Sequence, residues 1–116
     1  MAEKALTTVW VAGDRNGITT WASAATADTY EVFQHKSVLA DVIFGVEGLS
    51  DTTVQLHGSV DGTNFYQLKD ADGTLIALTS DGIIEVRAAT PYYKPVNSGG
   101  TDATIICSLH HAKVYA

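Results

Sequence analysis

The chain has 116 residues, enough for one domain, because compact domains usually run ~50–200 residues and a second hydrophobic core would not fit. Hydrophobic residues make up 46% of the chain and charged residues 17%, which excludes a disordered protein. Seven basic residues against thirteen acidic ones leave a net charge of −6, which is poorly suited to neutralising nucleic-acid phosphates. We therefore expect residues 1–116 to form a single globular domain that binds no nucleic acid.

The first half of the chain contains β-branched and apolar runs that predict strands. The first two of these runs lie in residues 1–21, which we expect to form an N-terminal arm or an edge strand. The next segment, Ala22–Asp28, is small and polar, which favours a loop or one short helical turn. Turns are expected at Gly13–Gly17 and at His35-Lys36. The predicted strands of this half are Leu6–Ala12, Ile18–Trp21, Thr29–Gln34 and Ser37–Val46.

Turn signals dominate the second half of the chain. Asp-Gly occurs at Asp61-Gly62, Asp72-Gly73 and Asp81-Gly82, and this dipeptide suits tight hairpins because glycine adopts positive φ without strain. These turns follow one another at spacings of eleven and nine residues, and turns at such regular spacings are typical of a β-sandwich or barrel. The strands predicted between them are Thr53–Val60, Asn64–Leu68, Thr74–Thr79 and Ile83–Ala88.

Alternation of apolar and polar residues predicts which faces of these strands are buried. Val54, Leu56 and Val60 share one face of their strand. The last predicted strand, Ala103–His110, places four residues on one face: Ala103, Ile105, Cys107 and Leu109.

Prolines and glycines mark the segment before the last strand. Pro91 and Pro95 flank Tyr92-Tyr93-Lys94 and lack an N–H, which favours a strand edge or an extended loop over a central strand. The Gly-rich segment Asn97–Thr101 is expected to be a hairpin tip. The sum of eight to ten short strands predicts an all-β fold, an antiparallel, jelly-roll-like β-sandwich.

Patterns for catalysis or metal binding are weak. Cys107 is the single cysteine, which excludes a multi-cysteine zinc site, and His110 and His111 would face opposite sides of a strand. A cross-strand metal site with His57 stays open. The segment 70–74, Asp-Ala-Asp-Gly-Thr, begins like a calcium loop but lacks the closing glutamate, which favours a turn. We expect the protein not to be an enzyme and to have no catalytic, cofactor-binding or metal-binding residue.

The aromatic residues are the main candidates for contact with a partner. Trp10, Trp21, Tyr92 and Tyr93 could anchor a protein interface or stack on sugars, and the alternative for each is packing in the core. Trp10 lies on the opposite strand face from its neighbours Val9 and Val11, so one side of this strand should expose a large apolar residue.

The stretch Val54–Leu68 resembles a strand–turn–strand unit of small β-sandwich proteins in tailed-bacteriophage particles. Its core is Gly-Ser-Val-Asp-Gly-Thr-Asn-Phe, followed by further Asp-Gly turns and by strands such as Ile84–Arg87. Discoidin-like carbohydrate-binding modules share the Gly-Ser-x-Asp-Gly-x-Asn hairpin. The resemblance covers about Val54–Leu109, roughly half of the chain.

The resemblance implies a non-enzymatic structural protein of the phage virion. Head decoration (cement) proteins are often sandwiches of this size, frequently trimers, that stabilise the capsid through contacts with the major capsid protein or other virion proteins. We expect such a homo-oligomer on the capsid surface, made in the host cytoplasm. The longest apolar stretch, Val38–Val46, is too short to span a membrane. The alternatives are a carbohydrate-binding or receptor-facing module of a phage tail or fibre, and a neck or tail structural protein.

Overall fold

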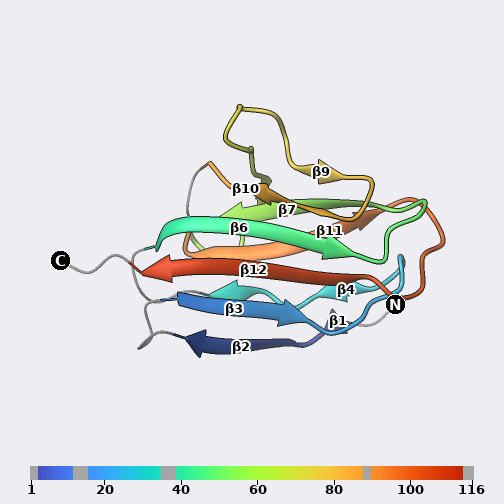
Figure 1. The fold of residues 1–116 in the computed structure, drawn as a ribbon, viewed down its shortest axis with the longest axis horizontal. Coiled ribbons are helices and arrows are strands. Elements are labelled where there is room, and N and C mark those ends of the chain that lie inside the picture. Colours follow the sequence, from blue (N-terminus) through green and yellow to red (C-terminus); the bar gives the residue numbers. More distant parts are fainter. Residues whose placement is uncertain (1–2, 12–15, 35–38, 88–89, 114–116) are drawn as a thin grey trace.

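The computed structural model describes residues 3–11, 16–34, 39–87 and 90–113, and the regular secondary structure in these ranges consists of β-strands alone. The predicted all-β sandwich is confirmed (Figure 1). The twelve strands are β1 (Glu3–Lys4), β2 (Leu6–Val11), β3 (Asn16–Trp21), β4 (Thr29–Tyr30), β5 (Phe33–Gln34), β6 (Leu39–Glu47), β7 (Thr53–Ser59), β8 (Tyr66–Gln67), β9 (Ala77–Leu78), β10 (Gly82–Glu85), β11 (Tyr92–Ser98) and β12 (Ile106–Lys113).

Two antiparallel sheets form the layers of the sandwich. The first sheet has the order β10-β6-β12-β3-β2, and the second has the order β5-β11-β7-β8, with β9 also pairing with β7. The short strands β1 and β4 pair with each other in parallel. From β5 onward the chain passes repeatedly from one sheet to the other, so strands far apart in sequence, such as β3 and β12, lie side by side.

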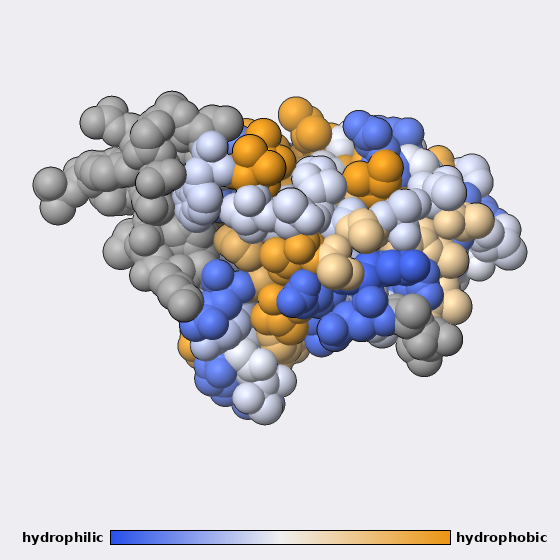
Figure 2. All heavy atoms as spheres, turned by 90° about the horizontal axis from the view of Figure 1, so that it is seen from below, coloured by the Kyte–Doolittle hydropathy of each residue, from blue (hydrophilic) through white to orange (hydrophobic). Residues whose placement is uncertain are grey.

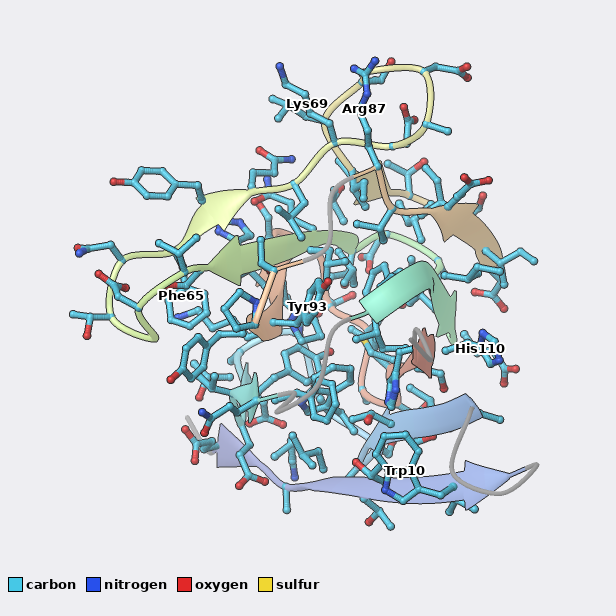
Figure 3. The ribbon with its side chains drawn as sticks, turned by 90° about the vertical axis from the view of Figure 1, so that its left-hand side faces the viewer. Trp10, Phe65, Lys69, Arg87, Tyr93 and His110 are labelled. Carbon is cyan, nitrogen blue, oxygen red and sulfur yellow. The ribbon has the colours of Figure 1, made fainter. Side chains whose placement is uncertain are left out.

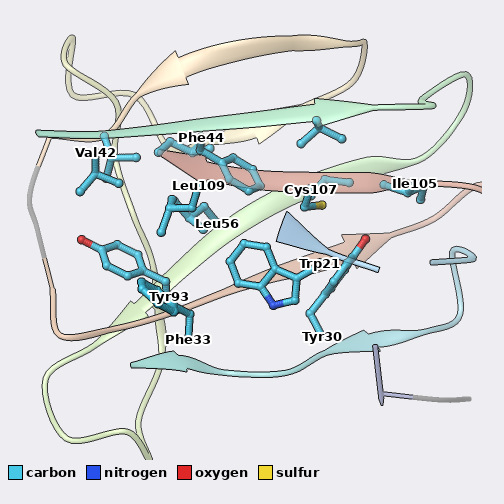
Figure 4. Close-up of a cluster of buried hydrophobic side chains, with 14 of the residues drawn as sticks. Trp21, Tyr30, Phe33, Val42, Phe44, Leu56, Tyr93, Ile105, Cys107 and Leu109 are labelled. Atoms are coloured by element: carbon cyan, nitrogen blue, oxygen red, sulfur yellow. The ribbon is translucent and has the colours of Figure 1, made fainter. Parts of the chain in front are cut away.

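The core lies between the inner faces of the two sheets (Figure 4). Phe44 and Leu109 from the first sheet meet Leu56 and Tyr93 from the second, and all four side chains are buried. The predicted alternation is confirmed for Val54 and Leu56 and for Ile105, Cys107 and Leu109, all of which are buried. Burial raises the pKa of the Cys107 thiol to about 12, so this cysteine packs as an apolar side chain.

Several predicted strands are shorter in the structure. Thr29–Gln34 forms two strands of two residues each, and this division, together with β1 and β11, brings the number of strands to twelve, above the predicted range. Val60 was expected on the buried face with Val54, but β7 ends at Ser59 and Val60 is 80% exposed. Ala103 is likewise exposed, because β12 begins only at Ile106.

The expectation for Tyr92-Tyr93-Lys94 is wrong. These residues begin β11, which pairs with β5 on one side and with β7 on the other. The β5 pairing covers only Tyr92 and Tyr93, so β11 has a single strand partner at Pro95, which is where a residue without an N–H is tolerated.

Two predicted hairpins are connections between the sheets instead. Asn97 and Ser98 still belong to β11, and Gly99 and Gly100, both at positive φ, lead away from it toward β12 in the other sheet. The Asp81-Gly82 turn leads from β9 in the second sheet to β10 in the first.

The segment Ala22–Asp28 is a loop. Ala24 forms an isolated bridge with Ile105, and Ala25–Asp28 is a single turn in which the Asp28 N–H donates to the Ala25 oxygen at 2.9 Å. The predicted turn at His35-Lys36 and most of the one at Gly13–Gly17 lie outside the described residues.

Candidate functional site

Two of the four aromatic candidates are core residues. Trp21 and Tyr93 are fully buried between the sheets. The Trp21 Nε1–H donates to the backbone oxygen of Glu31 at 2.7 Å, and the Tyr93 hydroxyl accepts from the backbone N–H of Thr90 at 2.8 Å. Their polar atoms are therefore satisfied inside the molecule, and neither side chain can contact a partner in this fold.

The other two aromatic candidates reach the surface in different places. Trp10 in β2 is 37% exposed and packs edge-on against His111, with ring centroids 5.1 Å apart. Tyr92 lies in β11 of the second sheet, where its hydroxyl accepts a hydrogen bond from Gln34 Nε2 at 3.2 Å. Because Trp10 and Tyr92 belong to different sheets, they do not form one flat aromatic platform of the kind that binds sugars.

The outer face of the first sheet carries an unexpected set of apolar side chains. Strand pairing places Ile43, His110, Ile18 and Val9 in one row across β6, β12, β3 and β2. Figure 3 shows His110 pointing away from the core, whereas Tyr93 lies inside. Five branched aliphatic residues on this surface are exposed, and we call them the outer aliphatic face: Val9, Ile18, Ile43, Ile83 and Ile106.

A shallow hollow lies at the β10 end of this face. Gly45 has no side chain there, and the space of about 470 Å³ is bordered by Ile83 and Ile106. Two carboxylates, Glu47 and Asp81, complete its border. The hollow can therefore receive an apolar side chain, and its acidic border favours a partner that brings lysine or arginine.

The sequence already shows apolar residues on both faces of the strands that form this surface, but alternation alone does not tell which of the two faces is exposed. Ile106 interrupts the polar side of its strand, and Ile83 precedes Ile84 on the opposite face of β10. Strands that are apolar on both sides indicate either burial of both faces or an exposed apolar face. Only the sheet order shows that, among the described residues, no layer covers the outer side.

The hairpin that carries the phage resemblance is held by its own side chains. Asp61 accepts hydrogen bonds from the backbone N–H groups of Thr63 and Asn64, at 2.8 and 2.9 Å. The Ser59 hydroxyl donates to Asp61 and accepts from the Gly62 N–H. Gly62 adopts a φ of 80°, which favours glycine. The conspicuous residues of this motif therefore form the turn, and Ser59, Asp61 and Asn64 also border a hollow of about 320 Å³.

At the opposite end of the molecule, the Asp102 carboxylate links the connection between β11 and β12 to the connection between β6 and β7. Asp102 accepts from the Ser50 hydroxyl and from the backbone N–H groups of Ser50 and Thr52. These hydrogen bonds, of which those from Ser50 have the largest effect, hold the pKa of Asp102 well below its ordinary value.

The calcium-like segment 70–74 is also a turn, in which Asp70 accepts hydrogen bonds from the backbone N–H groups of Asp72 and Thr74, each at 2.9 Å.

The lowered pKa of Asp102 predicts how acid affects stability. The unfolded-state pKa of aspartate is about 3.9, so the folded protein binds fewer protons than the unfolded chain as the pH falls below that value. The contribution of the ionised Asp102 to the free energy of unfolding is present above about pH 4 and is lost progressively as the pH falls below it. We expect the free energy of unfolding to fall less steeply between pH 5 and pH 3 in Asp102→Asn than in the wild type, measured by urea titration. Glu85→Gln, at an exposed strand position, is the control, and an unchanged slope in Asp102→Asn would contradict this prediction.

The described residues contain no group of three or more His, Cys, Asp or Glu side chains arranged to hold a metal ion. Nor does the described part of the chain include a helix long and apolar enough to cross a membrane. Neither protein-family models nor curated protein sequences match this chain. The candidate functional surface is the outer aliphatic face, on which five branched aliphatic side chains are exposed.

Proposed function

We propose that this protein is a structural protein of a tailed-bacteriophage virion, a head decoration protein that binds the capsid surface through its outer aliphatic face. The observation that carries the proposal is the exposure of five branched aliphatic residues on one side of one sheet. Exposed aliphatic side chains that gather on one face of a sheet often mark a contact with another macromolecule. The hairpin resemblance around Ser59–Asn64 supplies the class of partner.

Assembly on a lattice makes a modest docking surface sufficient. Each copy needs only weak contacts with the major capsid protein or its neighbours, because linked copies on a repeating shell bind with avidity. The hollow between Ile83 and Ile106 would receive an apolar side chain of the shell, and Glu47 would meet a basic residue beside it. The net charge of −6 keeps free copies soluble in the host cytoplasm before they assemble. The proposed action is protein–protein contact, with no catalytic step.

Co-sedimentation with undecorated heads of the phage that encodes the chain tests this proposal. Ile83 is 78% exposed, and Ile83→Lys is expected to weaken binding to heads roughly tenfold or more, because it removes an apolar contact and places a positive charge opposite a basic partner. Val60→Lys is the matched control, since Val60 is equally exposed but lies beyond the end of β7 in the second sheet. Equal binding of the two variants would contradict the proposed surface. A wild type that ignores heads but binds glycans or tail proteins would contradict decoration itself.

A further inference from the structure

The strand β2 ends the first sheet, and none of its own residues is charged. Its six residues, Leu-Thr-Thr-Val-Trp-Val, include neither proline nor lysine, the residues that commonly protect a sheet edge from pairing. Among the described residues, β3 is the only strand paired with β2. The opposite edge of the sheet, β10, is shorter and ends with Glu85, and the edge strands of the second sheet, β5 and β8, have two residues each.

Hydrogen bonding shows which backbone groups of β2 face outward. The Ala22 N–H donates to the Ala5 oxygen at 2.9 Å, so odd-numbered residues here direct their backbone groups toward β3. The Leu6 N–H faces the other way and is bonded to Glu31 Oε1 at 3.0 Å. Both backbone groups of Thr8 therefore point away from β3, and the side chain of Thr8 stays inside, bonded to the Thr19 hydroxyl at 2.8 Å.

The surface beside this edge is also suited to continuation into another sheet. Val9 is 56% exposed and ends the row of the outer aliphatic face that runs from Ile43 through Ile18. Figure 2 looks onto the side of the molecule where β2 lies and shows hydrophobic side chains near the middle, with hydrophilic ones on either side. A strand added to β2 would cover part of Val9 and extend the same row.

We propose that β2 pairs in an antiparallel manner with β2 of a second copy of this chain, about a two-fold axis that passes through Thr8. Successive side chains of a strand point to opposite faces of the sheet. The outer faces of the two copies therefore join into one surface only if odd-numbered residues lie opposite odd-numbered residues. A register in which Thr8 lies opposite Thr8 of the second copy meets this condition. The two Thr8 residues exchange two N–H···O=C bonds, and Val9 lies opposite Thr7 of the second copy on the outer face. The two five-stranded sheets become one sheet of ten strands.

Charge favours a second copy at this edge over other ways of self-association. Each chain carries a net charge of −6, so most pairs of surfaces brought together from two copies would repel. The segment from Leu6 to Val11 has no charged residue, and the carboxylate bonded at this edge, Glu31, lies at Leu6. In the register centred on Thr8 the two Glu31 carboxylates lie at opposite ends of the pairing, so two copies can meet without like charges directly opposite each other. A two-fold pairing gives a dimer, in place of the trimer that the decoration resemblance implies.

Light scattering on the purified protein tests this inference, with the variants Thr8→Pro and Val9→Lys. We expect the wild type to have twice the 12.3 kDa mass of one chain at micromolar concentration. Thr8→Pro removes the outward N–H together with the side-chain hydroxyl, and Val9→Lys places a charge at the junction, so both variants are expected to be monomers. Two controls should remain dimeric: Thr8→Ala, which removes the same hydroxyl but keeps the N–H, and Ile83→Lys, which adds a charge at the far edge of the same face.

Each outcome of this experiment supports or overturns the pairing. A monomeric or three-chain wild type would overturn it, as would dimers that persist in both Thr8→Pro and Val9→Lys. If Thr8→Pro loses its β-sheet circular dichroism, Val9→Lys alone decides, because the Val9 side chain projects from the outer face. The inference does not depend on the proposed function: a monomer that binds heads would contradict only the pairing, and a dimer that ignores heads would contradict only decoration.

Discussion

Replacing Trp21 with alanine is expected to lower the free energy of unfolding by roughly 3–5 kcal/mol. The side chain is fully buried on the inner face of β3 and meets Tyr30 edge-on, with ring centroids 6.3 Å apart. Alanine would leave a cavity that the two hydrogen-bonded sheets cannot close, and the Glu31 oxygen would lose the indole N–H bonded to it at 2.7 Å.

Urea titration followed by circular dichroism measures this loss. Trp10→Ala provides the comparison, since it removes the same side chain from a site that is already partly exposed to water. We expect the Trp10 variant to lose clearly less stability than the Trp21 variant. A loss below about 1 kcal/mol at Trp21 would show that Trp21 is not a core residue, and an equally large loss at Trp10 would show that Trp10 belongs to the core as well.

Gly17→Ala is expected to destabilise the protein by about 1–3 kcal/mol through overpacking. Gly17 lies in β3 where a Cβ atom would collide with His111 Cε1 and would come within 2.9 Å of Trp10 Cε3. His111 has little room to move, because it is buried and stacks on Phe33 with the ring centroids 5.0 Å apart. The added methyl group must therefore displace packed rings on the inner face of the sheet.

Gly82→Ala is a matched control for the Gly17 variant. Gly82 also lies in a strand of the first sheet, but a Cβ atom there would meet nothing within 4 Å. Alanine is favoured over glycine in strands by roughly 0.5–1 kcal/mol, so this variant should be as stable as the wild type or more stable. Thermal and urea unfolding of both variants measure the difference. A Gly17 variant that unfolds like the Gly82 variant would contradict the contact between Trp10 and His111 across Gly17.

The sequence predicted best where the strand faces alternate and turns are marked. Val54 and Leu56 could be assigned to the core because polar residues separate them, and the Asp61-Gly62 turn joins β7 to β8 as expected. Trp21 and Tyr93 could not be distinguished from surface anchors, since an aromatic residue in a short run suits either a core or an interface. The burial of both side chains depends on the strand pairing of β3 and β11, which local sequence does not specify.

The candidate surface depended still more on tertiary structure. Ile43, Ile83 and Ile106 are separated in sequence, and each has an apolar neighbour that could equally have faced outward. They share one face only because β6 pairs with β10 on one side and with β12 on the other. The uncharged run Leu6–Val11 was visible in the sequence, but its position at the free edge of a sheet follows from the strand order.

The most direct test of the account is hydroxyl-radical footprinting of the protein, free and bound to undecorated heads. We expect the oxidation of Ile83 and Ile106 to fall at least severalfold on binding, because both line the docking hollow on the outer face. Oxidation of Val60 and Leu75, which are exposed elsewhere on the molecule, should stay as it is in the free protein. Protection of Val60 or Leu75 with Ile83 and Ile106 left reactive would contradict the claim that the outer aliphatic face binds the capsid.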